Sequence, residues 1–348
     1  VMNYRREIDG LRALALIPVM LFHAGFQKFS GGFVGVDIFF VISGYLITSI
    51  IINEKDAGDF SIIKFYERRA RRLLPALFFV LLICLTISAW LMLPKDFKLF
   101  TNSLFSVAIF SSNIQFYREI GYFDIAAELK PLLHTWSLSV EEQYYLLFPL
   151  FVIATWRIGK GWMVKILVII ASASLIAAQW GSVSQPEATF FLLPTRGWEI
   201  LLGSFTAFYL PKEKVIIYRG VFGDACAVFG LILILYSVFY FDKKTPFPSL
   251  YALVPTIGAV LIILFATPKT IVGKILGARL LVGIGLISYS CYLWHQPLFA
   301  FARYASLGEP RKEFFIFLII ISILLGYFSW KFIFQFSHDQ EAFFYISM

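Results

Sequence analysis

The sequence contains little charge. Lys, Arg, Asp and Glu make up 15% of its 348 residues, whereas soluble domains carry about 25%. Hydrophobic residues reach 59%, and apolar runs long enough to cross a bilayer recur along the whole chain. This composition excludes an ordinary soluble domain. We therefore expect an all-α fold, a polytopic membrane helix bundle surrounded by membrane lipids.

Cysteine is also scarce. Cys84, Cys226 and Cys291 all lie inside apolar runs, which excludes a disulfide framework. The net charge is +8, but the basic residues stand in short loops, as topology signals do, so no nucleic-acid partner is expected. No metal site is expected either. The first apolar run, 11–29, has no small-residue cleavage site, which favours a retained helix over a signal peptide.

Eleven apolar runs are candidate spans. They lie at 11–29, 34–52, 73–93, 99–116, 142–156, 164–180, 194–210, 220–240, 250–266, 281–302 and 314–336. Ser, Asn and Gln interrupt the run 99–116, so we expect a re-entrant segment there and about ten transmembrane helices. This topology places more Lys and Arg inside, with both termini cytoplasmic. We expect one membrane domain, 1–348, with no appended soluble domain.

Ionisable residues inside apolar spans cost roughly 2.5–3.5 kcal/mol each at mid-helix, so each one needs a reason. Arg12 and His23 are eleven residues apart, which places them on one helical face and about 16 Å apart in depth. A functional track along this face would explain both residues. The alternatives are an interfacial topology charge for Arg12 and a hydrogen bond between packed helices for His23.

Asp37 follows a glycine-rich stretch, Gly31 to Gly35, that predicts a sharp turn on the outer side. Because Asp37 opens the returning helix, it should share a depth with His23. A carboxylate beside an imidazole fixes the tautomer and stabilises the imidazolium, as a general base requires. The alternative for Asp37 is a helix-start charge favoured by the dipole.

Four further ionisable residues are expected near the same depth: His134, Glu141, Glu142 and His295. His134 and Glu141 are seven residues apart and share a face if the segment is helical. We interpret all four as candidate catalytic residues alongside His23. Cap and dipole charges are the alternative for the first three, and a packing histidine is the alternative for His295.

Four arginines crowd the expected cytoplasmic start of the third span: Arg68, Arg69, Arg71 and Arg72. Guanidinium forks match phosphate oxygens bidentately, so this cluster predicts a cradle for a phosphorylated cofactor. The alternative is a topology anchor that also binds anionic lipid headgroups.

Together these segments resemble the acyltransferase 3 family of bacterial membrane O-acyltransferases that modify surface glycans. The matching motifs are Arg12-x10-His23, GGFVGVDIFFVISGYLI from Gly31, Arg68-Arg69-x-x-Arg72-Leu-x-Pro75, HTWSLSVEEQYYL from His134 and SYSCYLWHQPL from Ser288. They fall in the family's order across roughly residues 3–330. Many relatives continue with a Glu-x-Pro-like exit where this chain has Phe-Ile-Phe-Gln-Phe at 332–336, and some append an esterase-like domain that we do not expect here.

The resemblance implies an enzyme of the bacterial inner membrane with ten helices, a re-entrant segment after the third helix and catalysis around His23. It implies that an acyl group, usually acetyl, passes from cytoplasmic acyl-CoA to a sugar hydroxyl outside. The acceptor would be a lipid-linked or surface glycan such as lipopolysaccharide O-antigen, with capsule, exopolysaccharide and peptidoglycan also open.

Our hypothesis joins these residues in one path. Acetyl-CoA binds at Arg68, Arg69 and Arg72, and its pantetheine arm passes Arg12. His23, oriented by Asp37, takes the proton of the acceptor hydroxyl as general base. Protonated donors that would support the oxyanion or the acceptor are sought among His134, Glu141, Glu142 and His295. A covalent acyl-histidine is an open variant.

Two other functions compete with this hypothesis. A proton-coupled transporter would use intramembrane His, Asp and Glu as a relay, and it predicts paired half-repeats with broken helices in matching positions. The sequence shows neither feature. A non-enzymatic membrane scaffold or sensor would have no need of His23.

Overall fold

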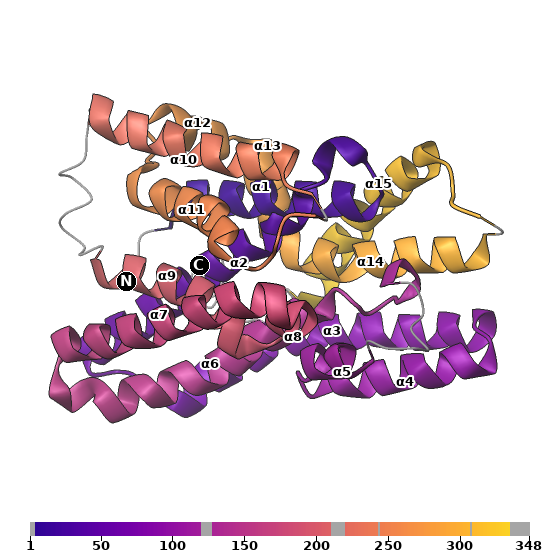
Figure 1. Cartoon of the computed structure of the whole chain (residues 1–348), viewed down its shortest axis with the longest axis horizontal. Coiled ribbons are helices and arrows are strands. Elements are labelled where there is room, and N and C mark those ends of the chain that lie inside the picture. The colour runs from indigo at the N-terminus through magenta and orange to yellow at the C-terminus, as the bar shows by residue number, and fades with distance from the viewer. Residues whose placement is uncertain (1–3, 120–126, 210–219, 243, 307, 335–348) are drawn as a thin grey trace. The chain divides into compact units, whose positions relative to one another are not determined.

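The described part of the chain is built from α-helices joined by short turns (Figure 1). This computed structural model describes residues 4–119, 127–209, 220–242, 244–306 and 308–334, and no strand occurs among them. The helices are α1 Arg6–His23, α2 Gly35–Ala57, α3 Ile62–Leu91, α4 Pro94–Ala108, α5 Ser112–Arg118, α6 Thr135–Thr155, α7 Lys160–Ser184, α8 Pro186–Phe191, α9 Leu193–Tyr209, α10 Val221–Tyr240, α11 Leu253–Phe265, α12 Ile271–Leu276, α13 Arg279–Leu286, α14 Ser288–Ala305 and α15 Lys312–Phe328. The all-α prediction is confirmed for these residues.

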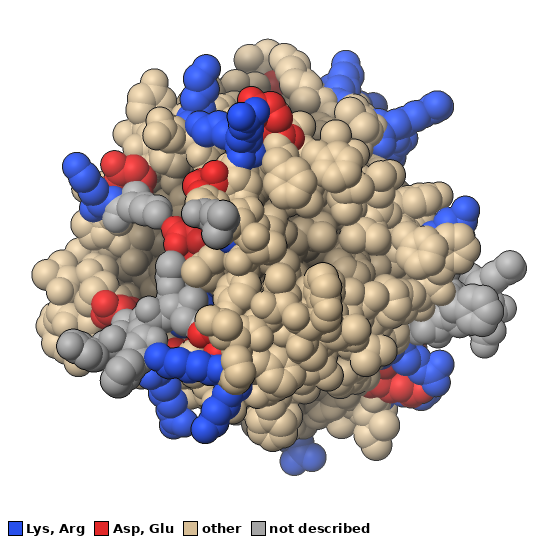
Figure 2. All heavy atoms as spheres, turned by 90° about the vertical axis from the view of Figure 1, so that its right-hand side faces the viewer, with Lys and Arg blue, Asp and Glu red and all other residues tan. Residues whose placement is uncertain are grey.

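Several helices have the length and composition of membrane spans. Five of them qualify within the described ranges: Gly32–Ala57, Ile62–Leu91, Lys160–Ser184, Val221–Tyr240 and Lys312–Ile333. Large apolar side chains stay exposed on these helices; Trp90 and Val221 are each 88% exposed. Uncharged atoms cover most of the face in Figure 2, and charged side chains gather in a few groups. Such a surface is stable in lipid. A membrane protein is thus supported, while the count of about ten spans stays a prediction.

The chain divides into two compact units, although the sequence has no linker segment that would predict this division. Unit 1 comprises Val1–Val19, Lys28–Phe60 and Val140–Gly285, and unit 2 comprises Met20–Gln27, Ser61–Ser139 and Leu286–Met348. Helices α1, α6 and α13 therefore contribute residues to both units.

The core of unit 1 is formed by apolar side chains from five helices. Its buried members include Leu11 of α1, Ile38 of α2, Ile234 of α10, Ile262 of α11 and Leu276 of α12. Burying such side chains inside helix contacts excludes lipid and allows dense van der Waals packing.

Helices α2 and α9 approach each other closely within unit 1. A Cβ atom at Gly44 would overlap the carbonyl oxygen of Ile200, and one at Gly203 would overlap that of Val41. Small residues at a helix contact let the two backbones come together, as in membrane helix pairs generally. This contact fixes α2, which carries Asp37, against α9.

Unit 2 contains α3, α4, α5, α14 and α15, with α14 packed on α15. The rings of Phe299 and Phe315 meet edge to face at 5.5 Å between α14 and α15. The indole N–H of Trp294 donates to Ser329 Oγ at 2.8 Å, and the Tyr289 hydroxyl donates to the carbonyl of Leu73 in α3 at 3.1 Å. Polar side chains thus pair across apolar helices, as burial requires.

Two expectations about the helices need correction. The arginine cluster does not stand at a helix start, because α3 already begins at Ile62 with Ser61 as its N-cap. Arg68–Arg72 therefore lie beyond the first turn of α3. Because this stretch is polar, the apolar run used to predict the helix began too late, at residue 73. The run 99–116 divides into α4 and α5, with Phe110 at a φ of 53° between them. That break was not predicted, and the re-entrant path itself remains a prediction.

Candidate active site

Three of the chain's four histidines meet in unit 2. His23 ends α1, His134 stands directly before α6, and His295 lies in α14. His23 Nδ1 is 3.0 Å from His295 Nε2, and the ring centroids of His134 and His295 are 5.3 Å apart. His134 and His295 are buried. The sequence analysis named all three as catalytic candidates, and the structure brings them together.

A backbone contact of His295 decides which ring nitrogens carry hydrogen. His295 Nδ1 lies 2.6 Å from the carbonyl oxygen of Tyr292, and a carbonyl only accepts, so Nδ1 is the donor. A neutral imidazole then offers Nε2 as an acceptor. His23 Nδ1 must therefore donate to His295 Nε2, which leaves His23 Nε2 with its lone pair. The hydrogen-bond network thus assigns His23 the tautomer of a general base.

Tyr292 positions both neighbouring histidines. Its carbonyl accepts from His295, and its hydroxyl donates to the carbonyl of His134 at 2.8 Å and lies 2.8 Å from Ser137 Oγ. Sequence reasoning did not single out Tyr292. Its place three residues before His295 was the available signal, because residues at i and i+3 of a helix lie on one face.

Pro297 explains a further feature of this helix. A proline has no N–H, so the carbonyl of Leu293, four residues earlier in α14, lacks its helical donor. Neither ring nitrogen of the buried His134 has a hydrogen-bond partner within the described part of the chain.

Arg303 holds the end of the helix that carries His23. Its Nη2 donates to the carbonyl oxygen of His23 at 2.8 Å, and its Nε donates to Glu309 at 2.9 Å. The guanidinium also lies 4.6 Å from the centre of the Phe315 ring. A cation at a helix C-terminus satisfies an unpaired carbonyl and complements the helix dipole. Arg303 thus fixes the position of His23 on the backbone side.

Asp37 has its partners inside unit 1. Arg196 Nη2 lies 3.0 Å from Asp37 Oδ1, and Arg196 Nη1 lies 3.1 Å from Glu199 Oε1. The side chains of all three residues are at most 1% exposed. The described hydrogen-bond partner of His23 Nδ1 is His295 Nε2, which accepts from it, whereas the sequence analysis expected Asp37 as the partner. The physical reason is that a buried carboxylate needs a full positive charge, which Arg196 supplies.

Arg196 and Glu199 were missed by sequence reasoning. Both stand in the apolar run 194–210, where the cost of intramembrane charge already marked other residues for attention. The rings of Phe40 and Phe247 lie 5.3 and 5.5 Å from the Arg196 guanidinium. Phe190 lies 5.7 Å from the same group, so two carboxyl groups and three aromatic rings surround one cation.

Glu141 and Glu142 lie on α6 within unit 1, half-buried. Glu141 Oε1 accepts a hydrogen bond of 2.8 Å from Ser43 of α2. Ser43 is six residues beyond Asp37 on the same helix, so Glu141 and Asp37 are both attached to α2. His134, which the sequence analysis placed on one face with Glu141, belongs to unit 2.

The predicted cofactor-binding arginines fall into two groups. Arg12 lies in unit 1, where its Nη1 is 3.5 Å from Asp9 Oδ1. The others lie on α3 in unit 2, where Arg68 is exposed and Arg69 and Arg72 are half-buried. Arg71 pairs with Glu67 at 2.6 Å. Across the described residues, no three His, Cys, Asp or Glu side chains are arranged to hold a metal ion.

Comparison with known proteins finds related sequences. A family model described as an acyltransferase domain matches residues 5–345. The peptidoglycan O-acetyltransferase OatA of Listeria monocytogenes is 32% identical over 312 residues, which cover 85% of this chain and 49% of the relative. The O-acetyltransferase OatA of Staphylococcus aureus is 30% identical over 346 residues, covering 95% and 57%. The chain thus spans about half the length of these curated relatives. No solved structure matches it significantly.

We predict that Arg196→Ala destabilises the protein by about 3–5 kcal/mol, because it leaves two buried carboxyl groups without their cation. Thermal unfolding in detergent would measure the loss. Arg71→Ala is the matched control; its exposed pair with Glu67 contributes at most about 1 kcal/mol. Adding Asp37→Asn and Glu199→Gln to Arg196→Ala should recover part of the stability. Equal melting temperatures for Arg196→Ala and Arg71→Ala would contradict the assignment.

Proposed function

Because the chain belongs to the acyltransferase 3 family, we propose that it transfers an acetyl group from acetyl-CoA to a hydroxyl of a glycan outside the bacterial cytoplasmic membrane. Both relatives are named as O-acetyltransferases, and the Listeria protein is named for peptidoglycan. Peptidoglycan is therefore the acceptor we propose, in preference to the lipopolysaccharide O-antigen that the sequence suggested first.

The hydrogen bond between His23 Nδ1 and His295 Nε2 carries this proposal. It leaves His23 Nε2 unprotonated, as the base for an alcohol must be. When Nε2 takes a proton, the positive charge on the ring strengthens the hydrogen bond that Nδ1–H donates to His295. His295 thus takes the orienting role that an aspartate has in other acyl-transfer sites.

The proposed reaction is a single acyl transfer. His23 Nε2 takes the proton of the acceptor hydroxyl while the oxygen of that hydroxyl attacks the carbonyl carbon of the thioester. The carbon–sulfur bond breaks, the coenzyme leaves as a thiolate, and the imidazolium returns the proton to that sulfur. His134 lies against His295 and would donate to the oxyanion when its ring carries a hydrogen toward the substrate.

The residues in unit 1 have a supporting part in this proposal. Asp37 is held by Arg196, and Glu141 by Ser43, which gives two carboxyl groups fixed positions on or against α2. We retain Asp37, Glu141 and the adjacent Glu142 as proposed catalytic residues whose effect on the acceptor remains to be measured.

The proposed topology follows from the family and from charge placement. About ten spans, with both termini cytoplasmic and the segment 99–116 re-entrant from outside, put α3's first turns at the inner surface. Arg68, Arg69 and Arg72 would there bind the phosphates of acetyl-CoA, and Arg12 would lie beside its pantetheine arm. Guanidinium forks suit phosphate groups better than lysine does.

We predict that His23→Ala lowers the rate of acetyl transfer by about 10²- to 10⁴-fold, the usual contribution of a general base. The protein in proteoliposomes would receive acetyl-labelled acetyl-CoA and the peptidoglycan disaccharide, and alkali-labile label on the sugar would be counted. Tyr289→Phe, which alters a hydrogen bond of α14 to Leu73, is the control and should stay active. Unchanged transfer by His23→Ala would remove His23 from the mechanism. Absence of transfer by the unaltered protein would favour a transporter.

We predict that Ala at Arg68, Arg69 or Arg72 raises the KM for acetyl-CoA by about 10- to 100-fold, the cost of one charge-assisted hydrogen bond. Lys should rescue only in part, because it lacks the planar fork. Arg71→Ala is the matched control on the same helix and should leave KM unchanged, since position 71 lies outside the motif Arg68-Arg69-x-x-Arg72. An unchanged KM for acetyl-CoA in all four variants would mean that the cluster acts only as a topology anchor.

A further inference from the structure

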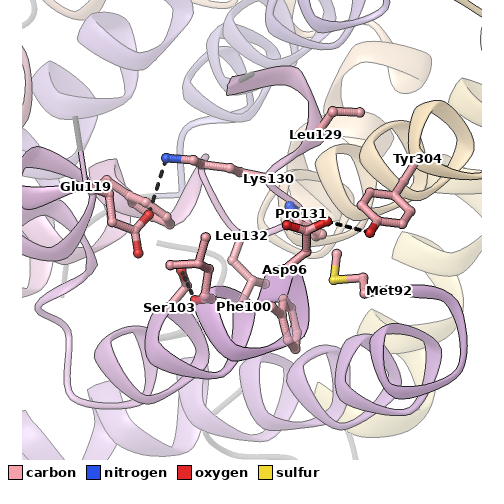
Figure 3. Close-up of a pocket in the computed structure, with 12 residues that line it drawn as sticks. Met92, Asp96, Phe100, Ser103, Glu119, Leu129, Lys130, Pro131, Leu132 and Tyr304 are labelled. Atoms are coloured by element: carbon pink, nitrogen blue, oxygen red, sulfur yellow. Dashed lines mark hydrogen bonds and ion pairs between the residues drawn. The ribbon is translucent and has the colours of Figure 1, made fainter. Parts of the chain in front are cut away.

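Unit 2 contains a small pocket between α4, α5, the segment before α6 and the end of α14 (Figure 3). Its volume is about 30 Å³, on a scale where one water needs about 10–15 Å³. That space accommodates one exocyclic group of a larger ligand rather than a whole ring. Its lining includes Asp96, Phe100, Phe116, Glu119, Lys130 and Tyr304.

Two polar pairs face this pocket from opposite sides of the view in Figure 3. The Tyr304 hydroxyl donates to Asp96 Oδ2 at 2.6 Å and accepts from the backbone N–H of Leu93 at 3.0 Å. Lys130 Nζ lies 3.3 Å from Glu119 Oε2. Glu119 Oε1 also accepts from Gln115 Nε2 at 2.9 Å. A carboxylate has room for about four hydrogen bonds, so Asp96 and Glu119 keep acceptor capacity beyond these partners.

The charge of the lining selects the kind of ligand. Two carboxylates and one ammonium give a net negative charge, which disfavours phosphate, carboxylate and other anions. Carboxylates accept hydrogen bonds from hydroxyl and amide N–H groups, while Phe100 and Phe116 provide apolar faces for the carbon skeleton. The exocyclic hydroxymethyl and acetamido groups of a sugar combine such a polar donor with a short carbon chain.

A direct connection links the pocket to the imidazole cluster. Gln296, the residue after His295, donates from Nε2 to the carbonyl oxygen of Lys130 at 3.4 Å. Tyr304 follows His295 by nine residues on α14, about 14 Å along the helix axis. The pocket is thus held at a fixed distance from the proposed base by one rigid helix.

We propose that this pocket receives one exocyclic group, such as the hydroxymethyl or acetamido group, of a sugar in the acceptor glycan and thereby presents a neighbouring sugar's hydroxyl to His23. This inference rests on the proposed function. Asp96 and Tyr304 receive the hydroxyl or amide groups of the bound sugar, and Lys130 with Glu119 closes the other side.

Binding of the peptidoglycan disaccharide to the protein in nanodiscs, with no acetyl donor present, tests the proposal. Asp96→Ala should raise the Kd about tenfold, the cost of one hydrogen bond to a charged group, and Tyr304→Phe should also raise it. Tyr117→Phe on α5, outside the pocket lining, is the matched control and should leave the Kd unchanged. The KM for acetyl-CoA should be the same in all of them.

The outcomes separate the pocket from the reaction. If the pocket variants bind the disaccharide more weakly but the unaltered protein transfers no acetyl group, the proposed function is wrong and the sugar site is supported. Acetyl transfer with equal disaccharide Kd in Asp96→Ala, Tyr304→Phe and the unaltered protein would overturn the sugar site alone. Melting temperatures of the variants exclude misfolding as the cause of lost binding.

Discussion

A carbonyl oxygen in the middle of a helix determines the chemistry of the candidate site. The carbonyl of Tyr292 can only accept, so His295 must donate to it, and His23 must donate to His295. The ring nitrogens of His23 and His295 are thereby assigned without a carboxylate partner. A low-dielectric interior favours such an arrangement, because a neutral hydrogen-bonded pair costs far less to bury than an ion. Arg303 and Tyr292 then fix the two ends of the series on the backbone.

The candidate residues are distributed over helices that have the length and hydropathy of a membrane span and helices that do not. Helices such as α7, α10 and α15 are long and apolar and expose large side chains. By contrast α1, α6 and α14, which carry His23, Glu141, Glu142 and His295, are not among the candidate spans found in the described residues. Polar residues in a membrane protein are retained where function or pairing requires them. Asp37 and the arginine cluster lie on α2 and α3, which are candidate spans, so an apolar signal alone does not separate the helices that hold the candidate residues.

How far the sequence predicts this structure depends on the residue. The all-helical fold and the family follow from apolar runs and motifs, and the cost of buried charge drew attention to His23, His134 and His295, which the structure brings together. The partner of Asp37 did not follow, because Arg196 is distant in sequence and a helical period says nothing about which helix packs opposite. Helix contacts set by Gly44 and Gly203 are likewise tertiary. The division into two units has no compositional signal, because helices cross from one into the other.

The protonation of His23 is the most direct test of this account. The chain has four histidines, so nitrogen NMR of protein labelled with ¹⁵N-histidine in nanodiscs gives few enough ring signals to assign with single-histidine variants. At neutral pH the account predicts that His23 carries hydrogen on Nδ1 and an unprotonated Nε2. It also predicts that replacing His295 with Phe releases that preference, because the acceptor for Nδ1–H is removed. Hydrogen on Nε2 of His23 in the unaltered protein would contradict the account.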